Sequence, residues 1–308
     1  MIVCCGEALI DMIPMSTECG EGFIPLSGGS VLNTAVALGR LRVETGMVTG
    51  LSSDIFGRQL SQTLEDSHVN TAHVITSNRP TTLAFVQLND GQASYSFFDE
   101  NSAGRMLEPK DMPYLPDEVS TLFFGGISLA CEPGAKAYLA LLEREARDRA
   151  VMLDPNIRQS FIEDEQIYRE RLNSMMQLAD IVKLSDEDLD WIAPKGFSIK
   201  EKIGWVLEKG PALVVLTQGE KGATGYLANG GKAKVSAERV KTVDTVGAGD
   251  TFNAGLLAKL SDIGMLQKSK LKALTEASLI QVLAFGTKVA AVTVGRAGAN
   301  SPWADELS

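Results

Sequence analysis

The sequence predicts an α/β fold with a central, mostly parallel β-sheet, helices on both faces and a small additional β-sheet. Across the 308 residues, short apolar runs alternate with amphipathic segments, as buried parallel strands alternate with their covering helices. No internal repeat and no Pro- or Ser-rich linker divides the chain, so we expect a single domain over residues 1–308. Strand patterns occupy residues 3–13, 45–50, 121–127, 150–154, 180–184 and 212–217, and helical patterns cover 136–149 and 199–209.

Two segments, at about residues 11–26 and 81–99, contain strand patterns with no helix between them. In the second segment, Asn89-Asp90-Gly91 separates two strand patterns, which is typical of a hairpin. A small sheet of this kind on an α/β body forms either a lid over a ligand or an ordinary edge hairpin. The sequence leaves both interpretations open.

Composition narrows the class of protein. The formal charge of −10 argues against nucleic acid as a partner, because binding to a duplex depends on Lys and Arg that neutralise phosphates. No run of 18 apolar residues occurs and the N-terminus lacks a basic segment, so we expect neither a membrane span nor a signal peptide. Four cysteines without a CxxC pair indicate reduced thiols in a cytoplasmic protein; they are Cys4, Cys5, Cys19 and Cys131.

The clearest motif is Asp-Thr-Val-Gly-Ala-Gly-Asp at residues 244–250, followed by a helical pattern. Gly247, Ala248 and Gly249 place small residues at a helix start, where free backbone N–H groups favour an anion. Asp250 at the same helix start is suited to accept a proton from an attacking hydroxyl. A tight turn with Asp250 as a plain N-cap is the alternative. The chain contains no Walker A loop, and Phe252 replaces the third glycine of a dinucleotide-binding fingerprint.

This motif resembles the C-terminal signature of the ribokinase-type (phosphofructokinase-B) carbohydrate kinases. The resemblance implies that Asp250 is the base that deprotonates a sugar hydroxyl. It also implies that the amides of Gly247, Ala248 and Gly249 form the anion hole. In this family a monovalent cation such as K⁺ often binds beside the loop, which would make Asp244 and Val246 its ligands.

Near the N-terminus, Gly28-Gly29 followed by Asn33 in a helical pattern resembles the first signature of that family. The two glycines allow close backbone approach, and the resemblance implies that Asn33 contacts the sugar. Asp11 is similar to the family aspartate that binds sugar hydroxyls, since a carboxylate makes strong hydrogen bonds. A solvated turn aspartate and a structural asparagine are the alternatives.

Two further segments match the substrate side of the family. Residues 154–158, Asp-Pro-Asn-Ile-Arg, resemble a segment of fructokinases and 2-keto-3-deoxygluconate kinases, which makes Arg158 a candidate for contacting substrate or phosphate. Strand-end polar residues are where ligands bind in open α/β sheets. Phe97 is similar to an aromatic residue that covers the sugar. A surface cation and plain apolar packing are the respective alternatives.

The nucleotide side rests on two segments. Lys183 and Ser185 lie in the place of the family motif for phosphate and magnesium, where Glu187 or Asp188 would organise Mg²⁺ through water. Thr217, Gly219 and Gly222 match the family's TxGxxG segment near ATP, although a hairpin turn explains the same glycines.

Because these motifs occur in the family's order along the chain, the sequence is identified as a fructokinase-like member of the family. The implied reaction is ATP-dependent phosphorylation of a monosaccharide's primary hydroxyl, with fructose first, 2-keto-3-deoxygluconate second and ribose third. The implied cofactors are ATP, Mg²⁺ and K⁺, and the partners are small molecules, with pairing of lids into a homodimer. A sensor that kept the fold without catalysis is the alternative from another class.

Overall fold

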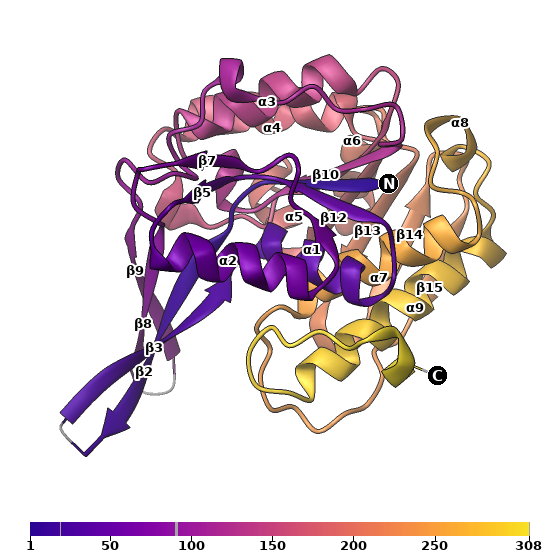
Figure 1. The fold of residues 1–308 in the computed structure, drawn as a ribbon. Helices are drawn as coiled ribbons and strands as arrows, with labels where there is room; N and C mark the ends of the chain where they lie inside the picture. The colour runs from indigo at the N-terminus through magenta and orange to yellow at the C-terminus, as the bar shows by residue number, and fades with distance from the viewer. Residues whose placement is uncertain (19, 90–91, 308) are drawn as a thin grey trace.

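The computed structural model describes residues 1–18, 20–89 and 92–307, and its centre is a nine-stranded sheet within these ranges (Figure 1). Seven neighbouring strands, from β6 to β13, run parallel, and the last two join antiparallel at one edge. In spatial order the strands are β6 (Val69–Asn70), β4 (Thr45–Val48), β1 (Ile2–Cys5), β10 (Thr121–Gly125), β11 (Ala150–Asp154), β12 (Ile181–Ser185), β13 (Leu213–Thr217), β14 (Ala223–Leu227) and β15 (Lys232–Val235).

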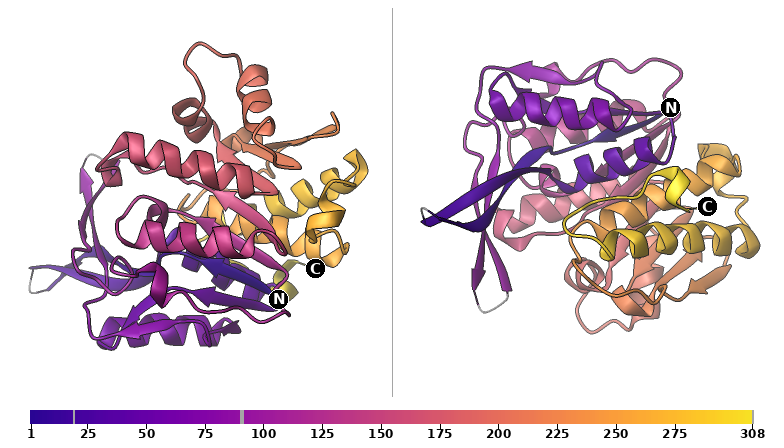
Figure 2. Two further views of the ribbon diagram at one scale, coloured as in Figure 1. Left: turned by 90° about the horizontal axis from the view of Figure 1, so that it is seen from above. Right: turned by 60° about the horizontal axis from the view of Figure 1, so that its bottom comes forward.

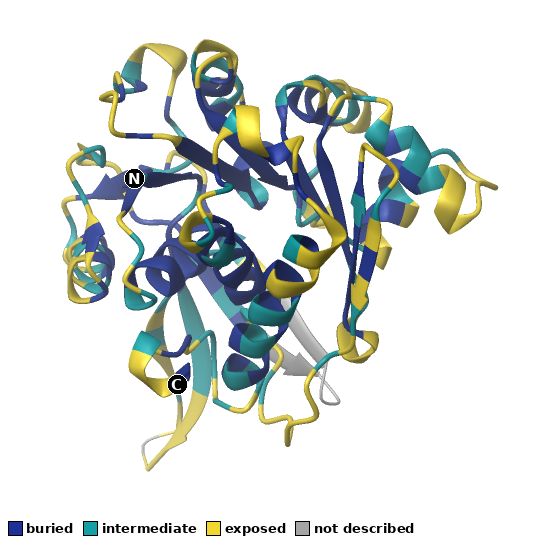
Figure 3. Ribbon diagram, turned by 90° about the vertical axis from the view of Figure 1, so that its right-hand side faces the viewer, coloured by how far each residue is buried: buried dark blue, intermediate teal, exposed yellow. Residues whose placement is uncertain are grey.

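Helices cover both faces of this sheet because successive strand residues point to opposite sides. In β1, for example, Ile2 and Cys4 join one hydrophobic core and Val3 and Cys5 join the other. The first core includes α1 (Ser30–Arg40), α2 (Ile55–Asp66), α7 (Ala248–Asp262), α8 (Lys268–Leu271) and α9 (Glu276–Val294). The second includes α3 (Gly134–Glu145), α4 (Glu165–Leu178), α5 (Asp186–Ile192) and α6 (Ile199–Leu207). Buried residues accordingly fill the sheet and the helix faces against it (Figure 3).

A four-stranded sheet projects from one side of this body (Figures 1 and 2). Its strand order is β3 (Gly20–Gly28), β2 (Leu9–Thr17), β8 (Leu83–Asn89) and β9 (Gln92–Phe98). We call these strands the lid sheet. The expected hairpin is present as the antiparallel pair β8–β9, whereas Asp90 and Gly91 of its expected turn lie outside the described residues. Strands β5 (Gly50–Ser52) and β7 (Ile75–Ser77) form a separate parallel pair.

The architecture confirms the predicted fold class, but two of the expected strands are each divided between two sheets. Residues 45–50 contain β4 of the central sheet and the first residue of β5, which pairs with β7. Residues 3–13 form two strands: β1 belongs to the central sheet, and β2 belongs to the lid sheet. Gly6 directly follows β1, in the short connection to β2. Glycine is favoured at this position because a side chain there would lie 2.5 Å from Val31 Cγ2. Asp11 therefore lies in a lid strand and not at the end of the first central strand.

Helix α9 bears on the expectation that the chain contains no membrane span. An 18-residue stretch of this 19-residue helix has a mean hydropathy of 1.6, so by length and composition it could cross a membrane, although Lys288 interrupts its apolar run. The helix packs against α7, β14 and β15 and buries Leu279 and Leu283 in the core. In this structure it therefore serves as a core helix.

Candidate active site

The candidate site lies where the carboxyl ends of β1, β11 and β12 meet the N-terminal ends of α1 and α7. Open α/β sheets bind ligands at this edge. Helices α1 and α7 pack against each other, which brings the N-terminal motif and the Gly-Ala-Gly motif together across more than 200 residues of sequence.

Helix α7 begins immediately after Gly247, which has a φ of 76° and acts as the N-cap. A methyl group on Gly247 would lie 2.5 Å from Ala299 Cβ, so both its conformation and its surroundings favour glycine. Asp250 is consequently the third residue of the helix, which rules out the plain N-cap interpretation of this aspartate. The Ala248 N–H of this first turn donates to the Thr245 carbonyl oxygen over 3.3 Å, whereas the N–H groups of Gly247 and Gly249 donate to no acceptor among the described residues. Unpaired amides at a helix start are suited to bind an anion.

The Asp250 carboxylate is buried and held by α1. Asn33 Nδ2 donates to Asp250 Oδ2 over 2.9 Å, and the Thr34 hydroxyl donates to the Asp250 carbonyl oxygen. Burial raises the pKa of Asp250 to about 7; the negative charge of Asp154 adds to the rise, while Asn33 and Lys183 oppose it. Asp250 Oδ1 accepts no hydrogen bond from the described residues. The side chain therefore combines a fixed orientation, a free acceptor oxygen and a pKa near neutrality.

A buried ion pair lies beside this helix start. Lys183 Nζ on β12 donates to Asp154 Oδ2 at the end of β11 over 3.0 Å, and Asn253 Nδ2 on α7 donates to the same oxygen over 2.7 Å. Burial opposes the charge on Lys183, but Asp154, Asp188 and Asp250 outweigh it and raise its pKa. A methyl group on Gly249 would lie 3.4 Å from Lys183 Nζ, so the ammonium group borders the Gly-Ala-Gly loop.

On the lid side, Asp11 and Gly28 lie together. A methyl group on Gly28 would lie 2.0 Å from Asp11 Oδ2, so glycine makes room for this carboxylate. Burial raises the pKa of Asp11 to about 6. No residue in the described part of the chain donates a hydrogen bond to the Asp11 carboxylate, which leaves both oxygens for a ligand.

Glu7, which the sequence analysis assigned no role, joins α1 to the loop after β10. Its Oε1 accepts from the Ser30 backbone N–H and hydroxyl, and its Oε2 accepts from the Ser128 N–H. Gly126 leaves space for this carboxylate, because a methyl group there would lie 2.0 Å from Glu7 Oε1. A methyl group on Gly29, which has a φ of 105°, would lie 3.0 Å from the Glu7 backbone oxygen and 3.2 Å from Glu7 Cγ. The second glycine of the Gly28-Gly29 pair thus faces a protein side chain.

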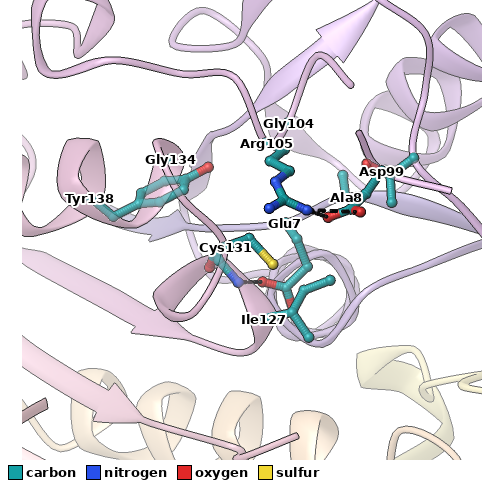
Figure 4. A pocket seen from close by; sticks show the side chains of 11 residues that line it. Glu7, Ala8, Asp99, Gly104, Arg105, Ile127, Cys131, Gly134 and Tyr138 are labelled. Carbon is teal, nitrogen blue, oxygen red and sulfur yellow. Dashed lines mark hydrogen bonds and ion pairs between the residues drawn. The ribbon is translucent and has the colours of Figure 1, made fainter. Parts of the chain in front are cut away.

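Arg105 is a second residue that the sequence analysis missed. Its guanidinium makes a bidentate ion pair with Asp99 at 3.1 Å and a further pair with Glu163 at 2.6 Å. Figure 4 shows Arg105, Asp99, Glu7 and Cys131 among the residues that line a pocket. The charge of Arg105 is therefore matched by two carboxylates.

The remaining predicted substrate residues lie at the edge of the site. Phe97 on β9 stacks edge-on against Phe161, with ring centroids 4.3 Å apart, so the lid sheet contacts the segment after β11. Arg158 is exposed and folds back on Asn156, where its Nη1 donates to Asn156 Oδ1 over 2.7 Å. Both therefore lie at the segment that follows β11, and no hydrogen bond or ion pair joins Arg158 to Asp250 in the described part of the chain.

The predicted nucleotide residues lie on neighbouring strands. Ser185 pairs with Thr217 in the register of β12 and β13. Ser185 and Asp188 form a capping box at the start of α5, in which Asp188 Oδ2 accepts from the Ser185 N–H and hydroxyl. Asp188 Oδ1 accepts from the Ile157 N–H, so protein donors already bind both of its oxygens. Glu187 is exposed.

Two loops complete this side of the site. Gly219 and Gly222 have positive φ values of 51° and 88° in the turn that joins β13 to β14. The two strands pair antiparallel, so these glycines do lie in a hairpin turn. Asp244 links the Gly-Ala-Gly loop to a second loop, because its carboxylate accepts from the N–H groups of Val246 and Gly298. The Val246 side chain is exposed.

Sequence signals existed for some of the missed residues. Glu7 directly follows the first strand, Asp154 opens the Asp-Pro-Asn-Ile-Arg segment, and Asn253 is three residues after Asp250 on the same helix face. Arg105 lies in a segment without periodicity, and no local pattern marks it.

Comparison with known proteins identifies the class. The pfkB family carbohydrate kinase model matches residues 1–306, so this chain belongs to the pfkB family of carbohydrate kinases. It is 48% identical over 280 residues to a fructokinase from Rhizobium leguminosarum bv. trifolii, covering 91% of this chain and 85% of that protein.

Solved structures agree with this assignment. The fold matches a fructokinase with bound ATP from Xylella fastidiosa with a TM-score of 0.91 at 27% identity, covering 99% of this chain and 96% of that one. It also matches a fructokinase double mutant from Vibrio cholerae O395 in its fructose-, ADP- and potassium-bound form. That TM-score is 0.84 at 28% identity, with 97% and 93% of the two chains covered. The protein is a sugar kinase.

Proposed function

We propose that the protein transfers the γ-phosphoryl group of ATP to the 6-hydroxyl of D-fructose. The observation that carries this proposal is the position of Asp250, whose free Oδ1 lies on the first turn of α7 next to the backbone amides of residues 247–249. A proton acceptor and an anion site thus share one helix start, as phosphoryl transfer to a hydroxyl requires.

In this mechanism Asp250 accepts the hydroxyl proton while the sugar oxygen attacks the γ-phosphorus. A pKa of about 7 suits a base that works near neutral pH. The amides of Gly247 and Gly249 hold the negative charge of the transferring group. The Ala248 amide joins them when it gives up its 3.3 Å hydrogen bond to the Thr245 carbonyl oxygen. Lys183, which borders Gly249, adds a fixed positive charge.

The sugar binds under the lid sheet. The open carboxylate of Asp11 accepts sugar hydroxyls, and Phe97 and Arg158 border the ligand. Gly28 acts by making room for the Asp11 carboxylate, and Gly29 acts by letting the start of α1 lie close to Glu7. Asn33 uses its amide nitrogen for Asp250, which leaves its amide oxygen for a sugar hydroxyl. The lid then excludes water, so that ATP is not hydrolysed wastefully.

The charges favour a neutral sugar over 2-keto-3-deoxygluconate. Asp11, Asp250 and Glu7 supply negative charge on the sugar side, and Arg105 is already paired with Asp99 and Glu163. A carboxylate on the substrate would meet repulsion there. The cations that could offset it are Arg158, which is exposed, and Lys183, which is already paired with Asp154.

ATP lies along the carboxyl ends of β12 and β13, near Lys183, Ser185, Thr217, Gly219 and Gly222. Mg²⁺ fits this side only through water, because protein donors already bind both oxygens of Asp188 and Glu187 is exposed. Magnesium commonly binds substrate phosphates and few protein ligands, and it would neutralise phosphate charge. For K⁺, the backbone and carboxylate oxygens of Asp244 and Val246 offer hard ligands beside the Gly-Ala-Gly loop.

We also propose that two copies pair through their lid sheets in the cytoplasm. Met15, Ile24 and Leu26 share the Asp11 face of the lid sheet and are between 41% and 45% exposed, an apolar surface that a second lid would cover. Light scattering on the wild type and on Ile24→Asp tests this, since loss of the dimer is expected in the variant.

The free buried thiols of Cys4, Cys5 and Cys131 suit a reducing compartment such as the cytoplasm.

A coupled ADP-release assay tests the reaction. Purified protein is supplied with MgATP and, separately, fructose, 2-keto-3-deoxygluconate, ribose and glucose. We expect the largest kcat/KM with fructose. A preference for the keto acid would keep the mechanism and change the substrate, and binding without turnover of any sugar would indicate a sensor.

A further inference from the structure

The buried pair of Lys183 and Asp154 is held by three separate elements. Asp154 lies at the end of β11 and Lys183 lies on β12, with side chains only 2% and 5% exposed. Asn253, from α7, donates to the same Asp154 oxygen that accepts from Lys183. One carboxylate oxygen therefore ties two central strands to the helix that carries Asp250.

This arrangement is costly for stability. Removing a carboxylate and an ammonium from water carries a desolvation penalty that their mutual attraction often fails to offset. In addition, Asp154 Oδ1 and Asn253 Oδ1 are buried without a hydrogen-bond partner among the described residues. Unsatisfied buried acceptors are rare and unfavourable in folded proteins. A cluster with these costs at the edge of an active site indicates a functional role.

The position of the ammonium group suggests that role. Lys183 Nζ borders Gly249, one residue before Asp250, and Asp154 is its only hydrogen-bond partner in the part of the chain that the structure describes. A lysine ammonium has three N–H donors, so two remain for a ligand at the start of α7.

We propose that Asp154 and Asn253 are positioning residues that hold the Lys183 ammonium group against the anion-binding loop. Asn253 fixes the position of the Asp154 carboxylate. Asp154 in turn fixes the position of the Lys183 ammonium group and keeps it charged, so that it faces the transferring phosphoryl group. The proposal rests on the proposed kinase function and adds to it two residues that act through a third.

A double-mutant cycle tests this coupling. Steady-state kinetics are measured for wild type, Asp154→Asn, Lys183→Met and the double variant, using whichever sugar the wild type turns over fastest. We expect Asp154→Asn to lower kcat about 100-fold, the size of loss typical when one charge-stabilising donor is displaced. KM for the sugar should change little. In the Lys183→Met background, Asp154→Asn should cause no further loss, because the group it positions is gone.

Asp180→Asn is the matched control. Asp180 is also a buried carboxylate beside β12 and pairs with Lys268 at 2.8 Å, but it lies at the opposite end of that strand. Its variant should retain the wild-type kcat. Thermal unfolding shows whether each variant is folded. If Asp154→Asn does not fold, Asn253→Ser supplies a second test. This variant removes the amide donor of Asn253, and we expect it to lower kcat partially.

The pH profile separates positioning from a purely structural role. Without the charge of Asp154, burial lowers the pKa of Lys183, so Asp154→Asn should lose activity at high pH where the wild type does not. Additive losses in the cycle, or an unchanged kcat in folded Asp154→Asn and Asn253→Ser, would overturn the proposal. Lack of fructose turnover by the wild type would instead count against the proposed substrate and leave the cycle to be run on another sugar.

Discussion

Asn33 Nδ2 donates a 2.9 Å hydrogen bond to Asp250 Oδ2, and this bond joins the two sequence motifs of the site. Asn33 lies on the first helix of the chain and Asp250 on α7, and both side chains are buried. The bond fixes one carboxylate oxygen and leaves the other available. It also favours the ionised form of a carboxylate that burial would otherwise keep protonated.

Asp250→Asn should abolish most turnover, because an amide cannot accept the hydroxyl proton. We expect kcat to fall by about 10²–10⁴-fold, the usual contribution of a general base, while ATP binding is retained. The ADP-release assay and calorimetric titration of ATP measure the two effects. Asp262→Asn, at the exposed end of the same helix, is the control and should behave as wild type. Near-normal turnover in Asp250→Asn would contradict the mechanism.

The rate should depend on pH through Asp250. Because the base must be ionised and its pKa is about 7, kcat/KM should rise with pH and level off above that value. Asn33→Leu removes a hydrogen bond that stabilises the ionised form, so the rising limb should move to higher pH. A limb that stays in place in this variant would show that Asn33 does not tune the base.

The stability of the folded protein should also depend on the ionisation of Asp250. Catalysis requires the ionised carboxylate, whereas folding favours the protonated one. A folded-state pKa raised above the unfolded value of 3.8 means that ionising Asp250 costs folding free energy. This cost is absent below about pH 4, grows as the pH rises and is complete above pH 7. Asp250→Asn should therefore have a higher Tm than the wild type at pH 8 and nearly the same Tm near pH 4, as measured by calorimetry. If the difference in Tm between the variant and the wild type does not shrink toward pH 4, ionisation of Asp250 is not the cause of that difference.

Gly28→Ala should weaken sugar binding without unfolding the protein. The new methyl group would lie 2.0 Å from Asp11 Oδ2, so the carboxylate must rotate away from its position. Loss of a hydrogen bond to a charged group corresponds to a rise in KM for the sugar of about 10- to 100-fold. Gly204→Ala in α6, where nothing lies within 4 Å of the new methyl group, should leave KM unchanged. An equal effect of both changes would exclude the Asp11 contact as the cause.

The fold class and the main elements of the site could be predicted from the sequence because short local patterns specify them. The Gly-Ala-Gly loop and the apolar strands each lie within a few consecutive residues. Sequence periodicity could not show that residues 3–13 divide between two sheets, since both strands are apolar and Gly6 alone marks the break. Nor could it find the partners of Arg105, which come from segments 6 and 58 residues away and depend on tertiary packing.

The position of the two motifs along the chain has a consequence for synthesis. Asp11 and Asn33 leave the ribosome early, whereas Asp250 and the loop before it emerge among the last 65 residues of the 308. Helix α1 packs on α7, so the nascent chain contains Asp11 and Asn33 long before it contains Asp250. The proposed mechanism therefore predicts that a truncated chain lacking α7 is inactive, and that phosphoryl transfer begins only when the end of the protein has folded against its beginning.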